Sequence, residues 1–467
     1  MKISVPDLSD FRNPKGLEKL SGFMKRLIYP CICLVFLALA CNYTSRATPN
    51  APNNPTPTTS PTANDSSLLG ETPVPEQTEE NKLPTPTAGS LIVAYIKDGN
   101  LWVWSQGQRR QLTQEGEVSR PRLSPDGRII AYLRPADDFH LEMWAINVNG
   151  ENERRLVSVA DLDAIGGGVR DPSALAINPY RFEWAPGTHQ LAYNTYQVFQ
   201  GPGLSLLNDL NLVEADTLQK TNLLLSGWGG EFYYSPDGGQ IAISQPDKVI
   251  LANADGSDYR PVMNYPVVTT YSEYRYYASP VWAEDGKSLR LALPPVDPLA
   301  TPQQPTSLWR IAADGSEPQQ NGTILAVPFF EQPVEFSPDL ARIAFVKEVG
   351  QPTENLRELH LAANDGSGDW MYAKAVALHF QGWAPEANRF AYTLGEAQEL
   401  WVGSLQDVPQ QPGGGMYGVQ NLGWVDSNRL LFWQSSGGGF ELFLANLQGG
   451  TLLLDTITGA PDYDFIP

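Results

Sequence analysis

The stretch Leu123-Ser124-Pro125-Asp126-Gly127-Arg128-Ile129-Ile130-Ala131-Tyr132 joins a tight polar turn to an apolar strand. Pro125 fixes its own φ angle, and Asp126-Gly127 supplies the permissive backbone that can complete such a turn. Residues 129–132 are mostly β-branched or aromatic, a composition typical of a buried strand. The segment therefore predicts a turn that leads directly into the core of a β-sheet.

The same turn and strand recur down the chain. Copies begin at Leu123, Trp184, Tyr234, Trp282, Phe336, Trp383 and Trp424. Successive starts are separated by 61, 50, 48, 54, 47 and 41 residues. A unit of this length that contains several short strands is the signature of a β-propeller blade. Chance recurrence of a common turn would not also place an apolar triplet after every copy.

The beginning of the folded part lacks such a turn. Residues 91–96 and 101–104 predict two strands, and Gln111 opens a third. At the other end, Phe465-Ile466-Pro467 aligns with Phe336-Ser337-Pro338. We therefore expect the C-terminal strand to be the innermost strand of the first blade, which closes the ring and removes exposed sheet edges. The predicted fold is all-β: a single propeller of eight four-stranded blades over residues 90–467. Seven blades with one irregular excursion are the alternative.

The composition restricts the partners and the chemistry. Lys plus Arg number 32 and Asp plus Glu 52, a net charge of −20 that disfavours nucleic acid and binding to anionic lipid through a basic patch. Cys31, Cys33 and Cys41 all precede the folded part, and the four histidines are scattered singly. Turn chemistry explains the Asx-Gly pairs, and no stretch matches a calcium loop. We expect a monomer with no cofactor and no metal site.

The first 41 residues resemble a bacterial lipoprotein signal peptide. Residues 24–26 form a basic n-region, residues 27–39 are mostly apolar, and small residues precede Cys41. The apolar run is too short for a comfortable membrane span. The resemblance implies cleavage after residue 40, lipid on Cys41 and an extracytoplasmic protein anchored to the cell membrane, although Ala38 stands where the family favours leucine. An uncleaved anchor and an ordinary signal peptide are the alternatives, and Met24 is a second possible start.

A tether is predicted to follow the lipidated cysteine, over residues 41–89. The segment after Cys41 is rich in Pro, Thr, Asn and Ser, as in Pro55-Thr56-Pro57-Thr58, and carries few apolar residues. Such a composition cannot bury enough surface to fold. As a random coil it would span about 40 Å. We expect it to hold the propeller away from the membrane.

The repeat as a whole resembles the TolB-type propeller repeat. The resemblance rests on the aromatic-Ser-Pro-Asp-Gly turn, the apolar triplet, a Trp-containing strand such as Met143-Trp144-Ala145-Ile146, and hairpins such as Asp255-Gly256. The same repeat forms the propellers of dipeptidyl-peptidase and prolyl-oligopeptidase enzymes. Its motifs are specific for the fold and nearly silent on function. The resemblance implies an extracytoplasmic binding platform. It also implies that the tryptophans that open the repeats have a structural role.

Binding residues are expected in the long connections, which join second to third strands or one blade to the next. These connections are residues 159–179, 196–203, 264–279, 294–306 and 408–418. Tyrosines in such loops suit contacts with protein or carbohydrate. We expect Tyr276 and Tyr277 to belong to the innermost strand of the fifth blade. The candidate ligand-binding residues are Asp161, Asp163, Arg170 and Asp171 in the first connection, with Tyr271, Glu273, Tyr274 and Arg275 in the fourth-to-fifth blade link.

The sequence predicts a binding platform for a protein, peptide or glycan, with no catalytic residue. A serine peptidase with this propeller needs a hydrolase domain marked by Gly-x-Ser-x-Gly, and the sequence contains neither the motif nor room for that domain. The alternative is a metal-dependent hydrolase or lactonase-like enzyme with its site in the propeller channel. Glu183, Glu231 and Glu335 immediately precede repeat turns, and the sequence does not decide whether they face that channel.

Overall fold

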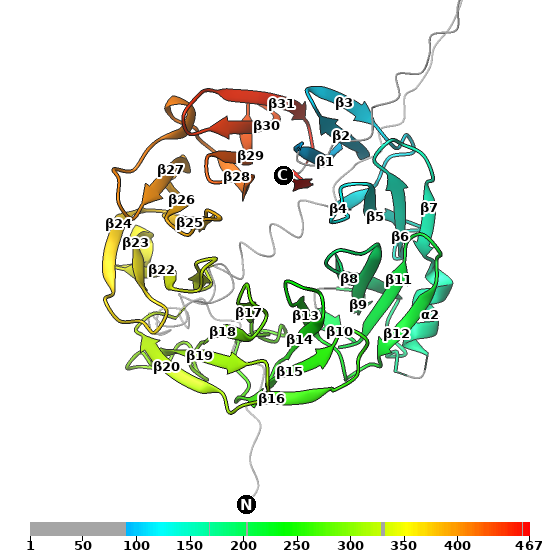
Figure 1. The fold of residues 1–467 in the computed structure, drawn as a ribbon, viewed down its shortest axis with the longest axis horizontal. Helices are drawn as coiled ribbons and strands as arrows, with labels where there is room; N and C mark the ends of the chain where they lie inside the picture. The colour runs from blue at the N-terminus through cyan, green and yellow to red at the C-terminus, as the bar shows by residue number, and fades with distance from the viewer. Residues whose placement is uncertain (1–89, 168, 202–203, 328–331, 460) are drawn as a thin grey trace, which may run out of the picture. The chain divides into compact units, whose positions relative to one another are not determined.

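A computed structural model describes residues 90–167, 169–201, 204–327, 332–459 and 461–467. The signal peptide, Cys41 and the tether predicted for residues 1–89 lie outside these described residues. The described part forms a ring of eight β-sheets around a common axis (Figure 1). The prediction of an all-β, eight-bladed propeller is confirmed, and the seven-bladed alternative is wrong.

Each blade is one antiparallel sheet whose strands lie side by side, from the innermost strand near the centre of the ring to the outermost strand at its rim (Figure 1). In blades 1 to 4 the strands are β1 (Ile92–Lys97), β2 (Asn100–Ser105), β3 (Gln108–Gln111) with β32 (Tyr463–Ile466); β4 (Ser119–Leu123), β5 (Ile129–Pro135), β6 (Leu141–Asn147), β7 (Arg154–Val157); β8 (Ala176–Trp184), β9 (Gln190–Val198), β10 (Ser205–Leu206), β11 (Leu210–Glu214), β12 (Lys220–Leu224); and β13 (Glu231–Tyr234), β14 (Gln240–Gln245), β15 (Lys248–Asn253), β16 (Arg260–Asn264).

The second half of the ring repeats this plan. In blades 5 to 8 the strands are β17 (Val281–Trp282), β18 (Ser288–Leu293), β19 (Thr306–Ala312), β20 (Gln319–Ile324); β21 (Glu335–Phe336), β22 (Arg342–Val349), β23 (Leu356–Ala363), β24 (Trp370–Val376); β25 (His379–Trp383), β26 (Arg389–Leu394), β27 (Glu399–Ser404); and β28 (Val419–Trp424), β29 (Arg429–Ser436), β30 (Gly439–Asn446), β31 (Thr451–Ile457). Helix α2 (Val159–Gly166) and the short 3₁₀ turns η3 (Pro352–Glu354) and η4 (Pro412–Gly414) lie in connections.

Two of the eight sheets depart from four strands. Blade 3 gains β10, which pairs with β9, and blade 7 has three strands within the described residues. Beyond β27, Gln410 makes a single bridge with Val402, and the Leu400 N–H donates to the Met416 carbonyl at 2.9 Å. The loop thus covers an edge that would otherwise be open to pairing with another chain. It also corrects the expected link at 408–418, because residues 405–409 form a turn and the link to blade 8 begins after Gln410.

The recurring turn is held by its serine. The Ser124 hydroxyl is fully buried, donates to Asp126 Oδ1 at 2.7 Å and accepts the Ile129 N–H at 3.0 Å. Gly127 takes a φ of +68°, which favours glycine. Ser235 makes the equivalent bonds with Asp237 and the Gln240 N–H. The turns that carry this serine therefore satisfy their own polar groups before the chain enters the core.

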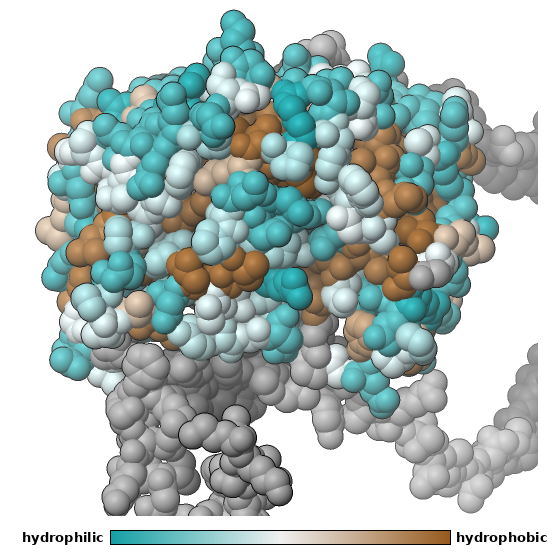
Figure 2. Space-filling model, turned by 90° about the horizontal axis from the view of Figure 1, so that it is seen from below, coloured by the Kyte–Doolittle hydropathy of each residue, from teal (hydrophilic) through white to brown (hydrophobic). Residues whose placement is uncertain are grey.

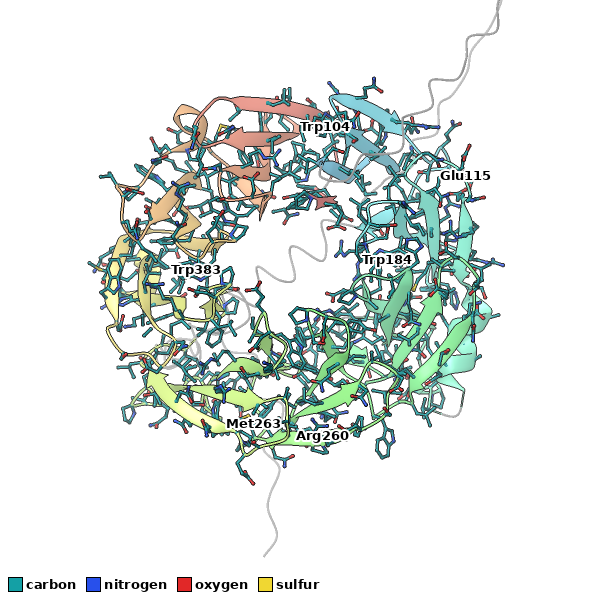
Figure 3. All side chains as sticks on the ribbon, viewed as in Figure 1. Trp104, Glu115, Trp184, Arg260, Met263 and Trp383 are labelled. Carbon is teal, nitrogen blue, oxygen red and sulfur yellow. The ribbon has the colours of Figure 1, made fainter. Side chains whose placement is uncertain are left out.

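The tryptophans that open four of the repeats join neighbouring blades. Each donates its indole N–H to a backbone carbonyl in the innermost strand of the preceding blade. The four bonds run from Trp184 to Arg122 at 3.0 Å, from Trp282 to Tyr233 at 2.9 Å, from Trp383 to Glu335 at 3.1 Å and from Trp424 to Gly382 at 3.2 Å. Figure 3 places Trp184 and Trp383 on opposite sides of the ring. The structural role that the resemblance implied for these tryptophans is to connect neighbouring blades.

The C-terminus closes the ring as expected. In blade 1, β32 pairs antiparallel with β1, with Ile92 opposite Ile466 and Val93 opposite Phe465 (Figure 1). The hydrophobic core lies between the faces of adjacent blades, so that one cluster combines Val103 of β2 with Ile130 of β5. β32 thus gives blade 1 its innermost strand and pairs the edge of β1 that would otherwise be open.

His189 links the polar turns of blades 2 and 3. Its Nδ1 lies 2.7 Å from Asp216 Oδ2 and its Nε2 lies 3.1 Å from Asp126 Oδ2. Arg154 and Arg128 also face these two carboxylates, at 3.8 and 3.4 Å. Burial alone would lower the pKa of His189, but the hydrogen bonds that its ring donates to both carboxylates raise it above its ordinary value. This contact makes the stability depend on pH.

We expect His189→Gln to be most destabilising in mildly acidic solution. A raised folded-state pKa contributes stability that is fully present below the unfolded pKa of about 6.5 and is lost as the pH rises through the folded pKa. The loss should be under about 1 kcal/mol because the pair is partly exposed. Urea denaturation of both proteins at pH 5.5 and pH 9 measures it. An equal difference at the two pH values would contradict the assignment.

Candidate functional site

The link from blade 4 to blade 5, residues 265–280, is fixed at both ends; we call it the tyrosine link. At its start the buried Tyr265 hydroxyl donates to the Gln245 carbonyl at 2.6 Å. Near its end the Tyr277 hydroxyl donates to Asn208 Oδ1 at 2.9 Å, and the Tyr276 hydroxyl reaches the Ala292 carbonyl at 3.4 Å. The expectation that Tyr276 and Tyr277 belong to the innermost strand is wrong, because β17 begins only at Val281. They anchor the link instead.

The middle of the tyrosine link is exposed yet ordered by its own hydrogen bonds. Tyr271 is 46% exposed and Tyr274 39%. The Thr270 hydroxyl bonds the Tyr274 carbonyl, and the Tyr274 N–H donates to the Ser272 hydroxyl at 3.2 Å. Glu273 and Arg275 are exposed beside them. The four predicted residues of this link are therefore brought together on one tip.

A second long connection supports the tip. It runs over residues 294–305 between β18 and β19, and we call it the proline loop. The Tyr271 hydroxyl donates to Asp297 Oδ1 at 2.7 Å, and the Thr269 N–H donates to the Val296 carbonyl at 2.8 Å. The hydrogen bond to Asp297 raises the pKa of Tyr271. Sequence reasoning listed this loop as long but missed Asp297, because a single carboxylate in a loop gives no periodic signal.

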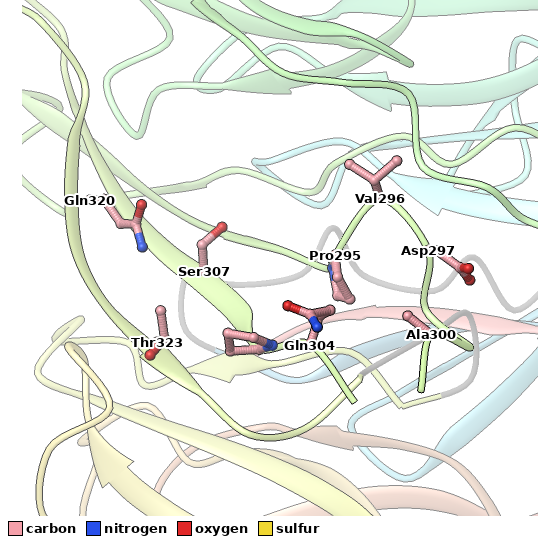
Figure 4. Close-up of a pocket in the computed structure, with 9 residues that line it drawn as sticks. Pro295, Val296, Asp297, Ala300, Gln304, Ser307, Gln320 and Thr323 are labelled. Atoms are coloured by element: carbon pink, nitrogen blue, oxygen red, sulfur yellow. The ribbon is translucent and has the colours of Figure 1, made fainter. Parts of the chain in front are cut away.

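The two connections border a shallow groove, which we call the Tyr–Pro groove. Its outer part is a hollow of about 470 Å³ (Figure 4). An adjoining hollow of about 390 Å³ extends it towards β16. Apolar walls alternate with carboxamide and hydroxyl groups, and Asp297 is the sole charged residue among those that line it. The principal lining residues are Tyr265, Pro266, Pro295, Val296, Gln304, Pro305, Ser307, Trp309 and Gln320.

The charged residues predicted in the link between blades 2 and 3 form hydrogen bonds and ion pairs within the protein. Residues 159–166 form α2, a helix that the sequence analysis did not foresee, and Asp161 caps it by accepting the Ser158 N–H at 2.8 Å. Asp161 also pairs with Lys220 at 2.9 Å. Asp163 pairs with Arg170 at 2.9 Å, and Asp171 accepts the Ser173 N–H at 2.8 Å. We therefore place the candidate site at the tyrosine link, where the side chains face solvent.

Exposed apolar side chains are unevenly distributed over the connections. Among the described residues, twelve of the twenty large apolar side chains that are exposed lie in second-to-third-strand loops or blade links; six lie in strands and two, Leu218 and Val408, in the other turns. On the side of the ring that Figure 2 shows, apolar surface is divided into several small patches by polar surface. Apolar side chains on loops of a rigid scaffold are well placed for contact with a partner. Tyr271, Tyr274, Val267, Val296 and Leu299 of the candidate site belong to this set.

The sequence did not decide whether the glutamates at the ends of the inner strands face the channel, and two of them form ion pairs. Arg181 of β8 bonds Glu183 at 2.6 Å and Glu231 of β13 at 3.3 Å, and its guanidinium lies 4.5 Å from the centre of the Tyr233 ring. Burial raises the pKa of Glu231 despite this pairing. Glu335 lies exposed on β21. Two of the three glutamates, Glu183 and Glu231, thus share one arginine.

Two further features concern membranes and metals. No helix among the described residues is long and apolar enough to cross a membrane. Within the same residues, no group of three or more His, Cys, Asp or Glu side chains is arranged to hold a metal ion.

No protein-family model and no curated protein sequence matches this chain. A solved structure of the eukaryotic initiation factor matches 80% of this chain and 98% of its own, at 8% identity and a TM-score of 0.48. The putative TolB from Agrobacterium tumefaciens matches 62% of this chain and 90% of its own, at 13% identity and a TM-score of 0.31. Dipeptidyl peptidase 4 of Porphyromonas gingivalis matches 72% and 53%, at 11% identity and a TM-score of 0.46. Peptidases and TolB both occur among these likenesses, which concern the fold and do not resolve whether the chain is an enzyme.

Proposed function

We propose that this protein is a lipid-anchored, extracytoplasmic and non-catalytic binding platform, and that it binds a protein partner at the tip of the tyrosine link and the Tyr–Pro groove. The observation that supports this best is the tip itself. Tyr271, Tyr274 and Arg275 are exposed on a loop whose ends are anchored by one buried and one half-buried tyrosine hydroxyl. Tyrosine and arginine are the residues that contribute most at protein interfaces, and a pre-ordered loop loses little entropy on binding.

The route of the chain supports the same assignment. β1 begins beside Ile466, at the edge of the ring where innermost strands lead into the polar turns. The tyrosine link and the proline loop join strands at the opposite edge. Ser90 therefore lies at the edge of the ring away from the candidate site. A partner could bind there while the lipid on Cys41 stays in the membrane.

The double variant Tyr271→Ala/Tyr274→Ala should abolish partner binding without unfolding the propeller. A photo-crosslinking amino acid at position 275 of the full-length chain, in native membranes, identifies the partner. The purified partner should then bind the double variant at least tenfold more weakly than the wild type, because hot-spot tyrosines contribute about 2 kcal/mol or more. Leu218→Ala, an exposed residue in the turn between β11 and β12, serves as the matched control. Equal affinities for all three proteins would refute the site.

The anchor is tested separately. Cys41→Ser should move the protein from the membrane to the soluble extracytoplasmic fraction and remove a lipid-sized mass from its N-terminal peptide. A membrane-bound Cys41→Ser protein would show that another segment holds it. The channel-enzyme alternative predicts stoichiometric metal and hydrolytic turnover in the purified protein, and either finding would overturn the non-catalytic assignment.

A further inference from the structure

Two arginines on the innermost strand of blade 2 have no ion-pair partner among the described residues. Neither the Arg120 nor the Arg122 guanidinium has a described carboxylate oxygen within 4.0 Å, whereas Arg181 on the next blade has two. Arg120 bonds the Tyr180 carbonyl through Nη2, and Arg122 bonds the Pro121 carbonyl at 2.7 Å through Nη1. Most of their hydrogen-bond donors remain available.

The two guanidinium groups lie over one aromatic ring. The centre of the Phe182 ring, on β8, is 5.1 Å from the Arg120 guanidinium carbon and 5.8 Å from that of Arg122. The ring stabilises each cation, but each cation also repels the other. Burial, followed by this repulsion, lowers the pKa of Arg120, and the nearby Asp462 carboxylate offsets the lowering only in part. A bound anion would add a further favourable interaction with both cations.

The backbone is shaped to produce this juxtaposition. The pairing of β4 with β5 shifts register between Ser119 and Arg122, which is a β-bulge, and Arg120 takes a φ of +55°. Such a φ is unfavourable for arginine and persists only where surrounding contacts impose it. Here Asp462 imposes it, because its Oδ2 accepts the Arg120 N–H at 2.6 Å.

The carboxylates nearest to the two arginines accept hydrogen bonds from the backbone of β4. Asp464 Oδ2 accepts the Leu123 N–H at 2.7 Å, as Asp462 accepts that of Arg120. Burial raises the pKa of both carboxyl groups. They hold the bulge of β4 in place, and neither forms an ion pair with the two guanidinium groups.

We propose that Arg120 and Arg122 form a binding site for an oxyanion, a carboxylate or phosphate group of a small ligand, at the inner edge of the ring. The planar fork of each guanidinium matches the two oxygens of such a group, and two adjacent forks can hold it from both sides. Because the chain has a net charge of −20, the long-range field opposes anions in general. Recognition therefore depends on this short-range geometry. The site is independent of the Tyr–Pro groove.

The experiment uses the full-length protein in detergent with two probes, inorganic phosphate and citrate, against chloride at matched ionic strength. At least one probe should raise the melting temperature saturably, and the preferred probe separates a phosphate from a carboxylate ligand. Arg122→Gln should weaken that binding about tenfold or more and leave the melting temperature without ligand unchanged or higher. Arg128→Gln, whose side chain is 70% exposed in the adjoining turn, should bind as the wild type does.

A second variant covers the case in which Arg122→Gln does not fold. Arg122→Lys keeps the charge and the aliphatic stem but loses the fork, so it should fold and still bind the probe several-fold more weakly. The proposal is overturned if neither probe gives a saturable shift in the wild type. It is also overturned if Arg122→Lys and Arg128→Gln bind the probe equally well, because the arginines would then only support the fold.

Discussion

A chain that ends at Gly459 should fail to fold cooperatively. The deletion removes β32, which pairs with β1 from Ile92 to Tyr95 and is the innermost strand of blade 1. Phe465 packs in the core between blades 1 and 8, and Ile466 packs in the core between blades 1 and 2. Both interfaces would lose apolar contacts at once, and the inner edge of β1 would be left unpaired. The combined loss is comparable to the 5–15 kcal/mol of net stability that a domain possesses.

Polar contacts of the same strand add to this effect. Asp462 and Asp464 accept backbone N–H groups of blade 2, and the Tyr463 hydroxyl donates to the Leu431 carbonyl of blade 8 at 3.0 Å. β32 therefore connects three blades. The truncated chain should show no sharp thermal transition by calorimetry and rapid proteolysis throughout residues 90–459.

The matched control is deletion of Pro467 alone, which leaves the four paired residues in place. That protein should melt as the wild type does. If the chain ending at Gly459 melted cooperatively within a few degrees of the wild type, the ring would not depend on its C-terminal strand. The adjacent inter-blade contacts would then be sufficient by themselves.

The fold was predictable from the sequence because its signal is periodic. Seven blades repeat an aromatic residue or Leu, a polar turn and an apolar segment that enters the core, and three of the turns carry the same serine (Ser124, Ser235 and Ser337), so one copy identifies the others. Even the closing strand followed from the alignment of Phe465 with Phe336. Helix α2 was missed because it lies in a link between blades and so belongs to no repeat. The absence of a fourth strand from the described part of blade 7 could not be predicted either, because residues 405–418 differ from the other repeats only in composition.

The candidate sites were less predictable for a physical reason. A binding loop need not repeat, so only its length and tyrosine content marked the tyrosine link, while its partner Asp297 had no signal. At the inner edge, Arg120 and Arg122 gain meaning only from the bulge in β4 and from Asp462, which is more than 300 residues away in the chain. Contacts that depend on ring closure join the two ends of the sequence. No local sequence pattern predicts such long-range contacts.

Replacing Asp455 by alanine should destabilise the propeller more than any other single loss of a carboxylate that we consider. Asp455 lies on β31 of blade 8 and is 2% exposed. Its oxygens accept hydrogen bonds from Tyr95 at 2.6 Å, Lys97 at 2.7 Å and Arg109 at 3.0 Å, all in blade 1. The substitution leaves the fully buried Tyr95 hydroxyl and the Lys97 ammonium without their acceptor. Leaving the buried Tyr95 hydroxyl without an acceptor costs about 1–3 kcal/mol. Loss of the ion pairs with Lys97 and Arg109, whose side chains are 23% and 49% exposed, adds up to about 1 kcal/mol each.

The pH dependence distinguishes this ion pair from simple packing. Burial alone would raise the pKa of Asp455, but the hydrogen bonds from Lys97 and Tyr95 hold it below its ordinary value. A depressed folded-state pKa contributes stability that is present above the unfolded pKa of about 3.9 and is lost as the pH falls through the folded pKa. Denaturant titrations should therefore show a large gap between wild type and Asp455→Ala at pH 7 that narrows below pH 4. Asp314→Ala, in an exposed hairpin turn, should change stability by less than about 1 kcal/mol at pH 7. A gap for Asp455→Ala that stays constant from pH 7 to pH 3 would mean that volume, and not charge, holds blades 1 and 8 together.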